Sequence, residues 1–268
     1  MQVNTIIHGD CLEVMPQIPN GSVDMILCDL PYGTTACKWD TIIPFEPLWE
    51  QYKRIIKDNG VIGLFGSEPF SSYLRMSNIK MFKYDWIWEK SVSGGFFDAK
   101  IRPLKKHEII SVFSLSGASN GTLSSGKQVM RYYPQGLEDC YKKRTKKNVS
   151  SFVSKVKNPE GMQIKTNYPN SIIKINNDKS IGHPTQKPVA LFEYLIKTYT
   201  NENDLVLDNC AGSGTTGVAC KNLNRNFILI EKDLGYFNIA QTRIAAIEKQ
   251  TLLFGTGNLH KHNERLIA

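Results

Sequence analysis

Two short motifs far apart in the chain carry side chains suited to chemistry. Asp29-Leu30-Pro31-Tyr32 lies near the start, and the stretch 208–216, DNCAGSGTT, lies near the end. In the first motif Asp29 can accept a proton of an exocyclic amine. Proline holds the residue before it extended, which can point the Leu30 carbonyl at the same nitrogen. Tyr32 offers a face on which a planar base can stack. The motif suits an aromatic amine, a poor nucleophile that positioning and electrostatics must activate.

The second motif has the surroundings of a nucleoside site. A strand at 204–208 is followed by a Gly-rich turn, a helix at 215–222 and a strand at 226–231 that ends in Glu231. Gly212 and Gly214 permit a tight turn and close approach of a ligand to the backbone. Glu231 lies roughly 20 residues beyond the turn, where a carboxylate can accept from ribose hydroxyls. A Gly-rich turn needed only for packing is the alternative.

The identity of the nucleoside depends on Asp208. Gly212, Gly214 and Gly217 formally satisfy the dinucleotide pattern. However, a carboxylate just before the turn is poorly placed beside a pyrophosphate and well placed beside an ammonium group. S-adenosylmethionine has a cationic amino-acid tail and a ribose, so it suits Asp208 at one end and Glu231 at the other.

Alternating strand and helix patterns predict the elements that position these motifs. We expect strands at 23–29, 61–65, 84–88, 108–113, 204–208 and 226–231, and helices at 45–57, 70–78, 188–199, 215–222 and 234–249. Such alternation predicts an α/β fold with a doubly wound, mostly parallel sheet. In a parallel sheet both motifs can emerge at the carboxyl edge, where such folds bind ligands. The pattern lapses between about 114 and 182, which indicates an inserted, loop-rich module.

Composition limits the class of protein. The 268 residues fit one large domain, or one domain with an insertion, and the 41% hydrophobic residues can form a substantial core. No apolar run approaches the roughly 20 residues that span a bilayer, and we expect no signal peptide. None of the six cysteines forms a C-x-x-C pair, which predicts reduced thiols in a cytoplasmic protein and no metal site.

The excess positive charge is concentrated in one segment. Residues 121–180 contain twelve Lys/Arg and four Asp/Glu, whereas the remainder has 21 of each sign, so the segment accounts for the net charge of +8. Charge placed this way is typical of a surface that binds a polyanion. A solvated basic loop is the alternative.

Four motifs together resemble the amino-methylating DNA methyltransferases, specifically the β class of restriction–modification or phage kind, whose catalytic motif precedes the cofactor motif. Residues 7–13, IHGDCLE, resemble the family's segment whose acid contacts the cofactor adenine. Residues 29–32 resemble its D-P-P-Y motif. Residues 183–188, HPTQKP, resemble the segment that helps hold the methionine part of the cofactor, and 208–216 resemble its F-x-G-x-G-T-T stretch. The order of these motifs implies a circularly permuted, Rossmann-like methyltransferase.

The resemblance implies a set of functional residues. The catalytic ones are Asp29, Leu30, Pro31 and Tyr32. The cofactor-binding ones are Asp10, Cys11, Asp29, Thr185, Lys187, Asp208, Cys210, Gly212, Ser213, Gly214, Thr215, Thr216 and Glu231. Two residues depart from the family. Leu30 replaces the first proline but offers the same carbonyl, and Cys210 stands near where the family often has an aromatic residue or proline. Asp29 favours adenine N6 over cytosine N4 as target, because cytosine enzymes usually begin the motif with Ser.

An amine inside a duplex is reached only by extruding its base. Tyr32 can stack on that base, and Phe97, in the segment 93–98, resembles the family's second wall. Core packing is the alternative for Phe97. Lys38 and Trp39 follow the catalytic motif closely enough to touch DNA. Given these motifs, we expect the basic run within the insertion to neutralise phosphates. Its members are Lys142, Lys143, Arg144, Lys146 and Lys147.

The sequence thus predicts a discontinuous catalytic domain at 1–114 and 181–258, a basic target-recognition region at 115–180 and a polar tail at 259–268. The expected partner is double-stranded DNA, and no membrane partner is expected. The sequence leaves open whether the chain works as a homodimer, as many relatives do, and whether it has a restriction endonuclease partner. Three alternatives remain at this point. They are a methyltransferase for cytosine N4 or RNA, a DNA-binding protein that keeps this fold without turnover, and an NAD oxidoreductase.

Overall fold

The computed structural model describes residues 2–34, 40–119, 125–143, 162–177 and 186–254. It divides the chain into two compact units. One unit is Met1–Tyr133 with Ser171–Ala268, and the other is Pro134–Asn170. In the part of the chain that the structure describes, no helix is long and apolar enough to cross a membrane.

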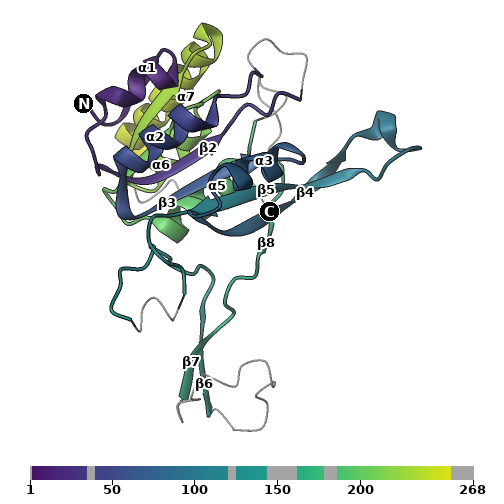
Figure 1. Ribbon diagram of the computed structural model, residues 1–268. Coiled ribbons are helices and arrows are strands. Elements are labelled where there is room, and N and C mark those ends of the chain that lie inside the picture. Colours follow the sequence, from purple (N-terminus) through teal and green to yellow (C-terminus); the bar gives the residue numbers. More distant parts are fainter. Residues whose placement is uncertain (1, 35–39, 120–124, 144–161, 178–185, 255–268) are drawn as a thin grey trace. The chain divides into compact units, whose positions relative to one another are not determined.

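The larger unit is built on an eight-stranded sheet with the order β1-β10-β9-β2-β3-β5-β4-β8 (Figure 1). Only β5 is antiparallel to its two neighbours; the other pairings are parallel. The mostly parallel α/β sheet expected from the sequence is therefore confirmed. The strands are β1 Thr5–His8, β2 Val23–Asp29, β3 Ile56–Gly66, β4 Phe82–Gly94, β5 Lys105–Phe113, β8 Ile172–Lys174, β9 Leu205–Asp208 and β10 Asn226–Glu231.

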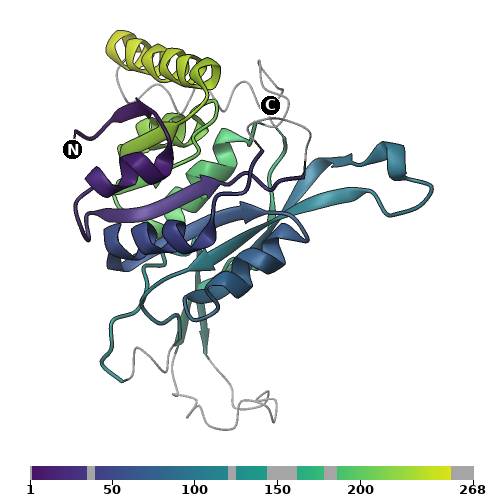
Figure 2. The same cartoon turned by 45° about the horizontal axis from the view of Figure 1, so that its top comes forward.

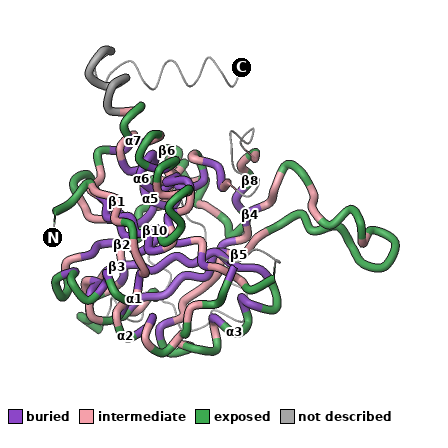
Figure 3. The backbone as a smooth tube through the Cα atoms, turned by 90° about the horizontal axis from the view of Figure 1, so that it is seen from above, coloured by how far each residue is buried: buried purple, intermediate pink, exposed green. Residues whose placement is uncertain are grey.

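Helices cover both faces of this sheet (Figure 2). They are α1 Cys11–Val14, α2 Phe45–Ile55, α3 Phe70–Ser77, α5 Val189–Tyr199, α6 Thr215–Asn222 and α7 Leu234–Phe254, with short 3₁₀ turns η1 Met15–Gln17 and η2 Phe96–Asp98. Alternate side chains of one strand enter different cores. In β2, Met25 and Leu27 pack with α5, α6 and α7, whereas Ile26 and Cys28 pack with α1, α2 and α3. Buried residues accordingly run through the strands (Figure 3).

The two chemical motifs meet where the winding of the sheet reverses. β9 and β2 are neighbours, with Met25 paired to Val206 and Ile26 to Leu207. From β9 the sheet continues through β10 to one edge, and from β2 it continues through β3 to the other. A crevice forms at such a switch point outside the carboxyl ends of the strands. Asp29 ends β2 and Asp208 ends β9, so both motifs lie at this crevice.

Each predicted strand and helix is found, with shifted bounds, but β1 and α1 were not predicted and β4 is longer than the strand expected at 84–88. The helix predicted at 45–57 ends at Ile55, because Ile56 is already extended. β3 starts at Ile56 and not at Val61; Val23 pairs with Ile56 and Met25 with Val61, so the chain bulges between these partners.

The region expected to be an insertion, 115–180, is divided between the two units. Met130 is buried in the core of the larger unit, and Arg131 donates to Asp24 at 2.8 Å and to Asp204 at 2.6 Å. β8 pairs with β4 of the main sheet. The second unit is narrower, Pro134–Asn170, and contains an antiparallel pair, β6 Glu138–Lys143 and β7 Met162–Thr166.

Candidate active site

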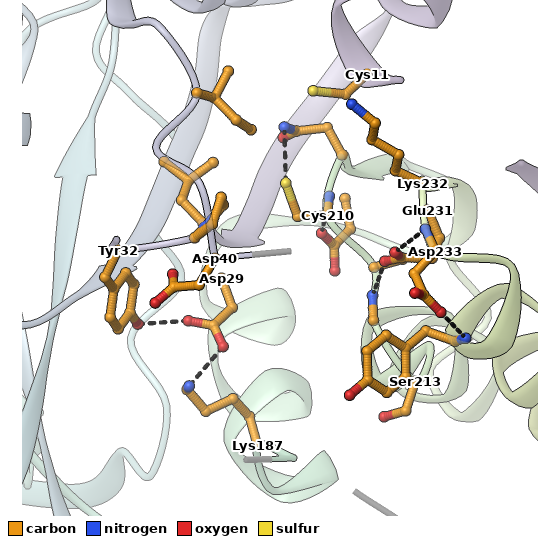
Figure 4. A pocket seen from close by; sticks show the side chains of 18 of the residues that line it. Cys11, Asp29, Tyr32, Asp40, Lys187, Cys210, Ser213, Glu231, Lys232 and Asp233 are labelled. Carbon is orange, nitrogen blue, oxygen red and sulfur yellow. Dashed lines mark hydrogen bonds and ion pairs between the residues drawn. The ribbon is translucent and has the colours of Figure 1, made fainter. Parts of the chain in front are cut away.

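The catalytic loop begins at Asp29, whose two carboxylate oxygens are both engaged. The Tyr32 hydroxyl donates to Oδ1 at 2.5 Å, and the Lys187 ammonium donates to Oδ2 at 2.6 Å (Figure 4). The Asp29 side chain keeps 30% of its surface exposed, so it remains accessible from the crevice. The loop therefore presents a carboxylate whose orientation is fixed from two sides.

The rest of the loop is anchored by packing and by a second acid. Leu30 is buried in the core, and the Tyr32 ring packs on Phe70 with centroids 5.1 Å apart. Burial raises the pKa of Tyr32 well above its usual value, and the Asp29 charge adds to this, so the phenol stays neutral and donates. Asp40 accepts from the amides of Gly33 and Thr34, each at 2.8 Å. Asp40 closes the loop, a role that sequence reasoning missed.

Lys187 joins Asp29 to a second buried carboxylate. Its ammonium lies 3.2 Å from Oε2 of Glu108, and Oε1 of Glu108 accepts from Lys90 at 2.9 Å. Lys187 precedes α5, whereas Glu108 and Lys90 come from β5 and β4. Glu108 and Lys90 were not expected from the sequence, because no motif marks them; only the pairing of β4 with β5 brings them together.

On the cofactor side, Asp208 is buried and holds the Gly-rich turn. Its carboxylate accepts from the amide of Cys210 at 3.1 Å and from the Thr216 hydroxyl. Burial raises its pKa to about 7. Gly214 has a φ of +79°, and a Cβ there would lie 2.8 Å from the Cβ of Ala240. The turn therefore requires glycine for both conformation and space.

Glu231, at the end of β10, and Asp10, the N-cap of α1, flank this turn. Glu231 accepts from the amide of Gly212 at 2.7 Å and from that of Asp233 at 2.8 Å, and burial raises its pKa. Asp10 caps α1 by accepting from the amide of Leu12 at 2.9 Å and also accepts from Lys232 at 2.9 Å, a contact that lowers its pKa. Since β1 pairs with β10, the two acids lie at the same edge of the sheet.

Three thiols lie close together at the turn: Cys210, which belongs to it, and Cys11 and Cys28, which contact Cys210. Cys11 and Cys210 line the cavity described below, and Cys28 is fully buried. Burial raises the pKa of Cys28 to about 12, and contact with Cys210 raises that of Cys11, so these thiols are neutral. The five cysteines that the structure describes are unpaired thiols, and no group of three potential metal ligands is found among the described residues.

One cavity of about 820 Å³ contains both motifs. This volume is in the range of small-molecule sites. The predicted site residues that line it are Asp10, Cys11, Asp29, Leu30, Pro31, Tyr32, Lys187, Asp208, Cys210, Gly212, Ser213, Thr215 and Glu231. Gly214 and Thr216 lie behind this surface, where Gly214 makes the turn and Thr216 binds Asp208. Figure 4 shows the catalytic and cofactor sides facing one another.

Among the residues that the structure describes, none of those predicted to contact DNA, apart from Tyr32, lines this cavity, and several other predicted contacts lie outside the described residues. Phe97 is fully exposed near the tip of the β4–β5 hairpin and does not line the cavity. Lys142 is exposed on β6, in the second unit, and the side chain of Lys143 is not described. Lys38, Trp39, Arg144, Lys146, Lys147 and Thr185 lie outside the described residues, as does the tail 259–268.

Comparisons with known proteins find DNA methyltransferases that are similar to this chain. The chain is similar to the type II methyltransferase M.HinfI of Haemophilus influenzae, with 28% identity over 92% of this chain and 69% of that protein. It is equally similar to the DNA adenine methyltransferase YhdJ of Escherichia coli K12, with 28% identity over 98% of this chain and 92% of that protein.

Solved structures show the same fold. The complex of M1.HpyAVI with SAM is 27% identical, covers 89% of this chain and 98% of that chain, and has a TM-score of 0.58. The cytosine-N4-specific PvuII DNA methyltransferase is 16% identical, covers 89% of this chain and 85% of that chain, and has a TM-score of 0.63, which concerns the fold alone.

The family model described as DNA methylase, of the N6/N4 methyltransferases, matches residues 23–242. This range includes the catalytic loop, the Gly-rich turn and the strands that carry them. Because the match spans most of the chain, the protein belongs to the DNA methylase family.

Proposed function

We propose that this protein transfers a methyl group from S-adenosylmethionine to the N6 amine of adenine at specific sites in DNA. One observation carries the proposal. The fixed carboxylate of Asp29 and the Gly-rich turn with its flanking acids open into the same cavity, so an amine and a methyl donor can meet there.

The residues of the cavity fit the cofactor. Asp10 caps α1 just after β1, and Glu231 ends the neighbouring β10, where carboxylates suit the hydroxyls and ring edge of a nucleoside. Asp208 and Ser213 lie at the turn, toward the catalytic loop, where the amino-acid tail would be held. Cys11 and Cys210 supply a neutral wall. When bound, the cofactor supplies an electrophilic methyl group on a sulfonium. M1.HpyAVI, a structural relative, has been solved as its SAM complex.

The catalytic loop activates the amine by position. Oδ1 of Asp29 accepts one N–H of the target amine, and the Leu30 carbonyl accepts the other. Tyr32 then lies against the base, and two acceptors off the ring plane favour a nitrogen whose lone pair faces the methyl donor. As the new N–C bond forms, the S–CH3 bond of the sulfonium would break and leave S-adenosylhomocysteine. The extra amine proton then passes to Asp29 or to water, because the methylated nitrogen is strongly acidic.

Adenine is favoured over cytosine by two observations. The motif begins with Asp29 and not with Ser. The relative YhdJ, similar over nearly its full length, is named a DNA adenine methyltransferase.

DNA contact is assigned to three places. Tyr32 receives the extruded base, Phe97 on its exposed hairpin enters the duplex, and the basic run at 142–147 binds phosphates. Lys38 and Trp39, next to the catalytic loop, are further contacts. Since M.HinfI is named a type II methyltransferase, we extend the proposal to a restriction–modification role in the cytoplasm. In this role the protein would work with an endonuclease that shares its recognition site. We also propose a homodimer as the working form.

Identification of the modified base tests the function. Unmethylated DNA is incubated with enzyme and methyl-labelled S-adenosylmethionine, digested to nucleosides and analysed by mass spectrometry. N6-methyldeoxyadenosine is expected, and Asp29→Ala should yield none. Detection of N4-methyldeoxycytidine would show that cytosine is the target base instead of adenine. Absence of methyl transfer to DNA of mixed sequence would reject the proposal. Mapping the modified adenines in DNA from an expressing host gives the recognition site.

A further inference from the structure

Lys187 lies between two carboxylates that come from different parts of the sheet. Its ammonium is 2.6 Å from Oδ2 of Asp29 and 3.2 Å from Oε2 of Glu108, and its side chain is only 10% exposed. The ammonium also lies over the rings of Tyr32 and Phe65, at 6.0 and 5.6 Å from their centroids. A lysine enclosed this way has little freedom to swing toward another ligand.

Glu108 holds Lys187 in place. It is 13% exposed, and its Oε1 accepts from Lys90. Its Oε2 has no hydrogen-bond partner of good geometry among the described residues, so the ammonium of Lys187 is the charge that compensates this oxygen. A buried carboxylate without such compensation is costly. The ion pair with Glu108 therefore holds the ammonium of Lys187 in place.

Lys187 and its neighbouring carboxylates stabilise one another in their charged forms. Burial alone would lower the pKa of Lys187, but Asp29 and Glu108 outweigh it and raise that pKa. For Glu108 burial opposes the charged form, yet Lys187 and Lys90 lower its pKa. Lys187 and Glu108 are thus both charged at neutral pH.

This arrangement makes the two oxygens of Asp29 unequal. Oδ2 is bound by a cation that is itself fixed from behind, whereas Oδ1 is bound only by the neutral Tyr32 hydroxyl. An incoming amine displaces the hydroxyl far more easily than the ammonium, since charge-assisted hydrogen bonds are the stronger ones. The Tyr32 hydroxyl thus occupies, in the free protein, the donor position that the amine takes in the complex.

We propose that Lys187 is a positioning residue for methyl transfer: held by Glu108, it fixes Oδ2 of Asp29 so that Oδ1 faces the target amine. The inference rests on the proposed function and deepens it. It differs from the role implied by the family resemblance, in which Lys187 helps to hold the methionine part of the cofactor. A positioning role affects the chemical step, whereas a cofactor-holding role affects cofactor affinity.

Four variants separate these roles: Lys187→Met, Lys187→Arg, Glu108→Gln and the double variant Lys187→Met/Glu108→Gln. Lys53→Met, at an exposed lysine of α2, is the matched control. Two quantities are measured for each. One is the dissociation constant for S-adenosylmethionine by calorimetry, which also shows that the variant is folded. The other is the single-turnover rate of methyl transfer at saturating cofactor and DNA.

For Lys187→Met we expect the single-turnover rate to fall about 100-fold, the size of effect that a misplaced catalytic group produces, with cofactor affinity within about threefold of wild type. Lys187→Arg should recover about tenfold of that loss, because a guanidinium can also bridge two carboxylates. Glu108→Gln alone should cost about tenfold, and little in the Lys187→Met background, since it acts through Lys187.

Other results overturn the inference. A near-normal single-turnover rate for Lys187→Met with strongly weakened cofactor binding would assign Lys187 to the cofactor. Additive losses in the double variant would show that Glu108 does not act through Lys187. Failure of the proposed function is distinguished at the start, because the wild-type enzyme would then transfer no methyl group to DNA.

Discussion

The hydroxyl of Tyr32 donates a 2.5 Å hydrogen bond to Oδ1 of Asp29, the carboxylate three residues before it in the chain. The same tyrosine ring packs on Phe70 and lies under the ammonium of Lys187. A residue placed to stack on a target base is therefore bound, in the free protein, to the acceptor of that base's amine. The contact must open before an amine reaches Oδ1.

This relationship predicts different effects on methyl transfer for two substitutions of Tyr32. Tyr32→Phe keeps the ring and removes the competing hydroxyl, so the single-turnover rate should stay within about threefold of wild type or rise. Tyr32→Ala removes the stacking surface and should weaken the productive complex about tenfold or more, since base–aromatic stacking contributes roughly 1–3 kcal/mol. Rate measurements at saturating DNA check both. An equal loss in the two variants would show that the hydroxyl itself takes part in catalysis.

Removal of the carboxylate should abolish transfer. For Asp29→Ala we expect at least ~100-fold slower methylation, because the acceptor that directs the amine is lost. Cofactor affinity should change little, since the Gly-rich turn is held by Asp208 and Glu231. Labelled-methyl transfer and calorimetry measure the two quantities, with Asp58→Ala, at an exposed acid, as control. Turnover near the wild-type rate would contradict the assignment.

Phe97, at the exposed tip of the β4–β5 hairpin, should help to displace the target base from the duplex. Phe97→Ala is expected to lower the fluorescence gain of DNA that carries 2-aminopurine at the target adenine, because the ring helps to displace the base. The defect should shrink on DNA with a mismatch at that position, where extrusion costs less. Cofactor binding by the same variant is the control. Identical defects on paired and mismatched DNA would show that Phe97 does not assist base extrusion.

The basic run at 142–147 should determine the salt dependence of binding. Replacing Lys142, Lys143, Arg144, Lys146 and Lys147 by Ala is expected to lower DNA affinity and to flatten the slope of log K against log salt. The slope should fall by about 0.9 for each phosphate contact removed, hence by up to ~4.5 for the five residues of the run. Titrations at several salt concentrations measure this slope. The paired change Lys53→Ala/Lys80→Ala, at exposed lysines of the other unit, should leave it unaltered, and an unchanged slope in the first variant would refute the DNA contact.

Asp208 should make stability depend on pH. Its pKa is raised by burial to about 7, so the folded protein holds a proton that the unfolded chain releases between roughly pH 4 and pH 7. Its contribution to the free energy of unfolding therefore declines as pH rises through this window, by at most about 1.4 kcal/mol per pH unit, and levels off above pH 7. Urea unfolding of wild type and Asp208→Asn at each pH measures the difference. A difference that stays constant from pH 4 to pH 8 would contradict the raised pKa.

Periodicity and motif order determined much of the fold. Val23–Asp29, Thr215–Asn222 and Asn226–Glu231 form the elements expected of them, because a buried apolar run predicts a strand and a Gly-rich turn after a strand marks the start of a helix. The position of the two motifs at strand ends followed as well, since parallel strands present their carboxyl ends at one edge. β8 was less predictable: its three residues gain their strand conformation from pairing with β4, which lies far away in sequence.

The sequence alone identified the Asp29 carboxylate, the Tyr32 ring and the Gly-rich turn, because each lies in a short, contiguous motif, 29–32 or 208–216, with a distinctive combination of side chains. Only the tertiary structure decided what holds them. Glu108 and Lys90 become neighbours through the register of β4 against β5, and Lys187 reaches both Glu108 and Asp29 because α5 packs over the centre of the sheet. Ion pairs between residues this far apart in the chain leave no local pattern in a sequence, since whether two charged residues meet depends on which strands lie side by side.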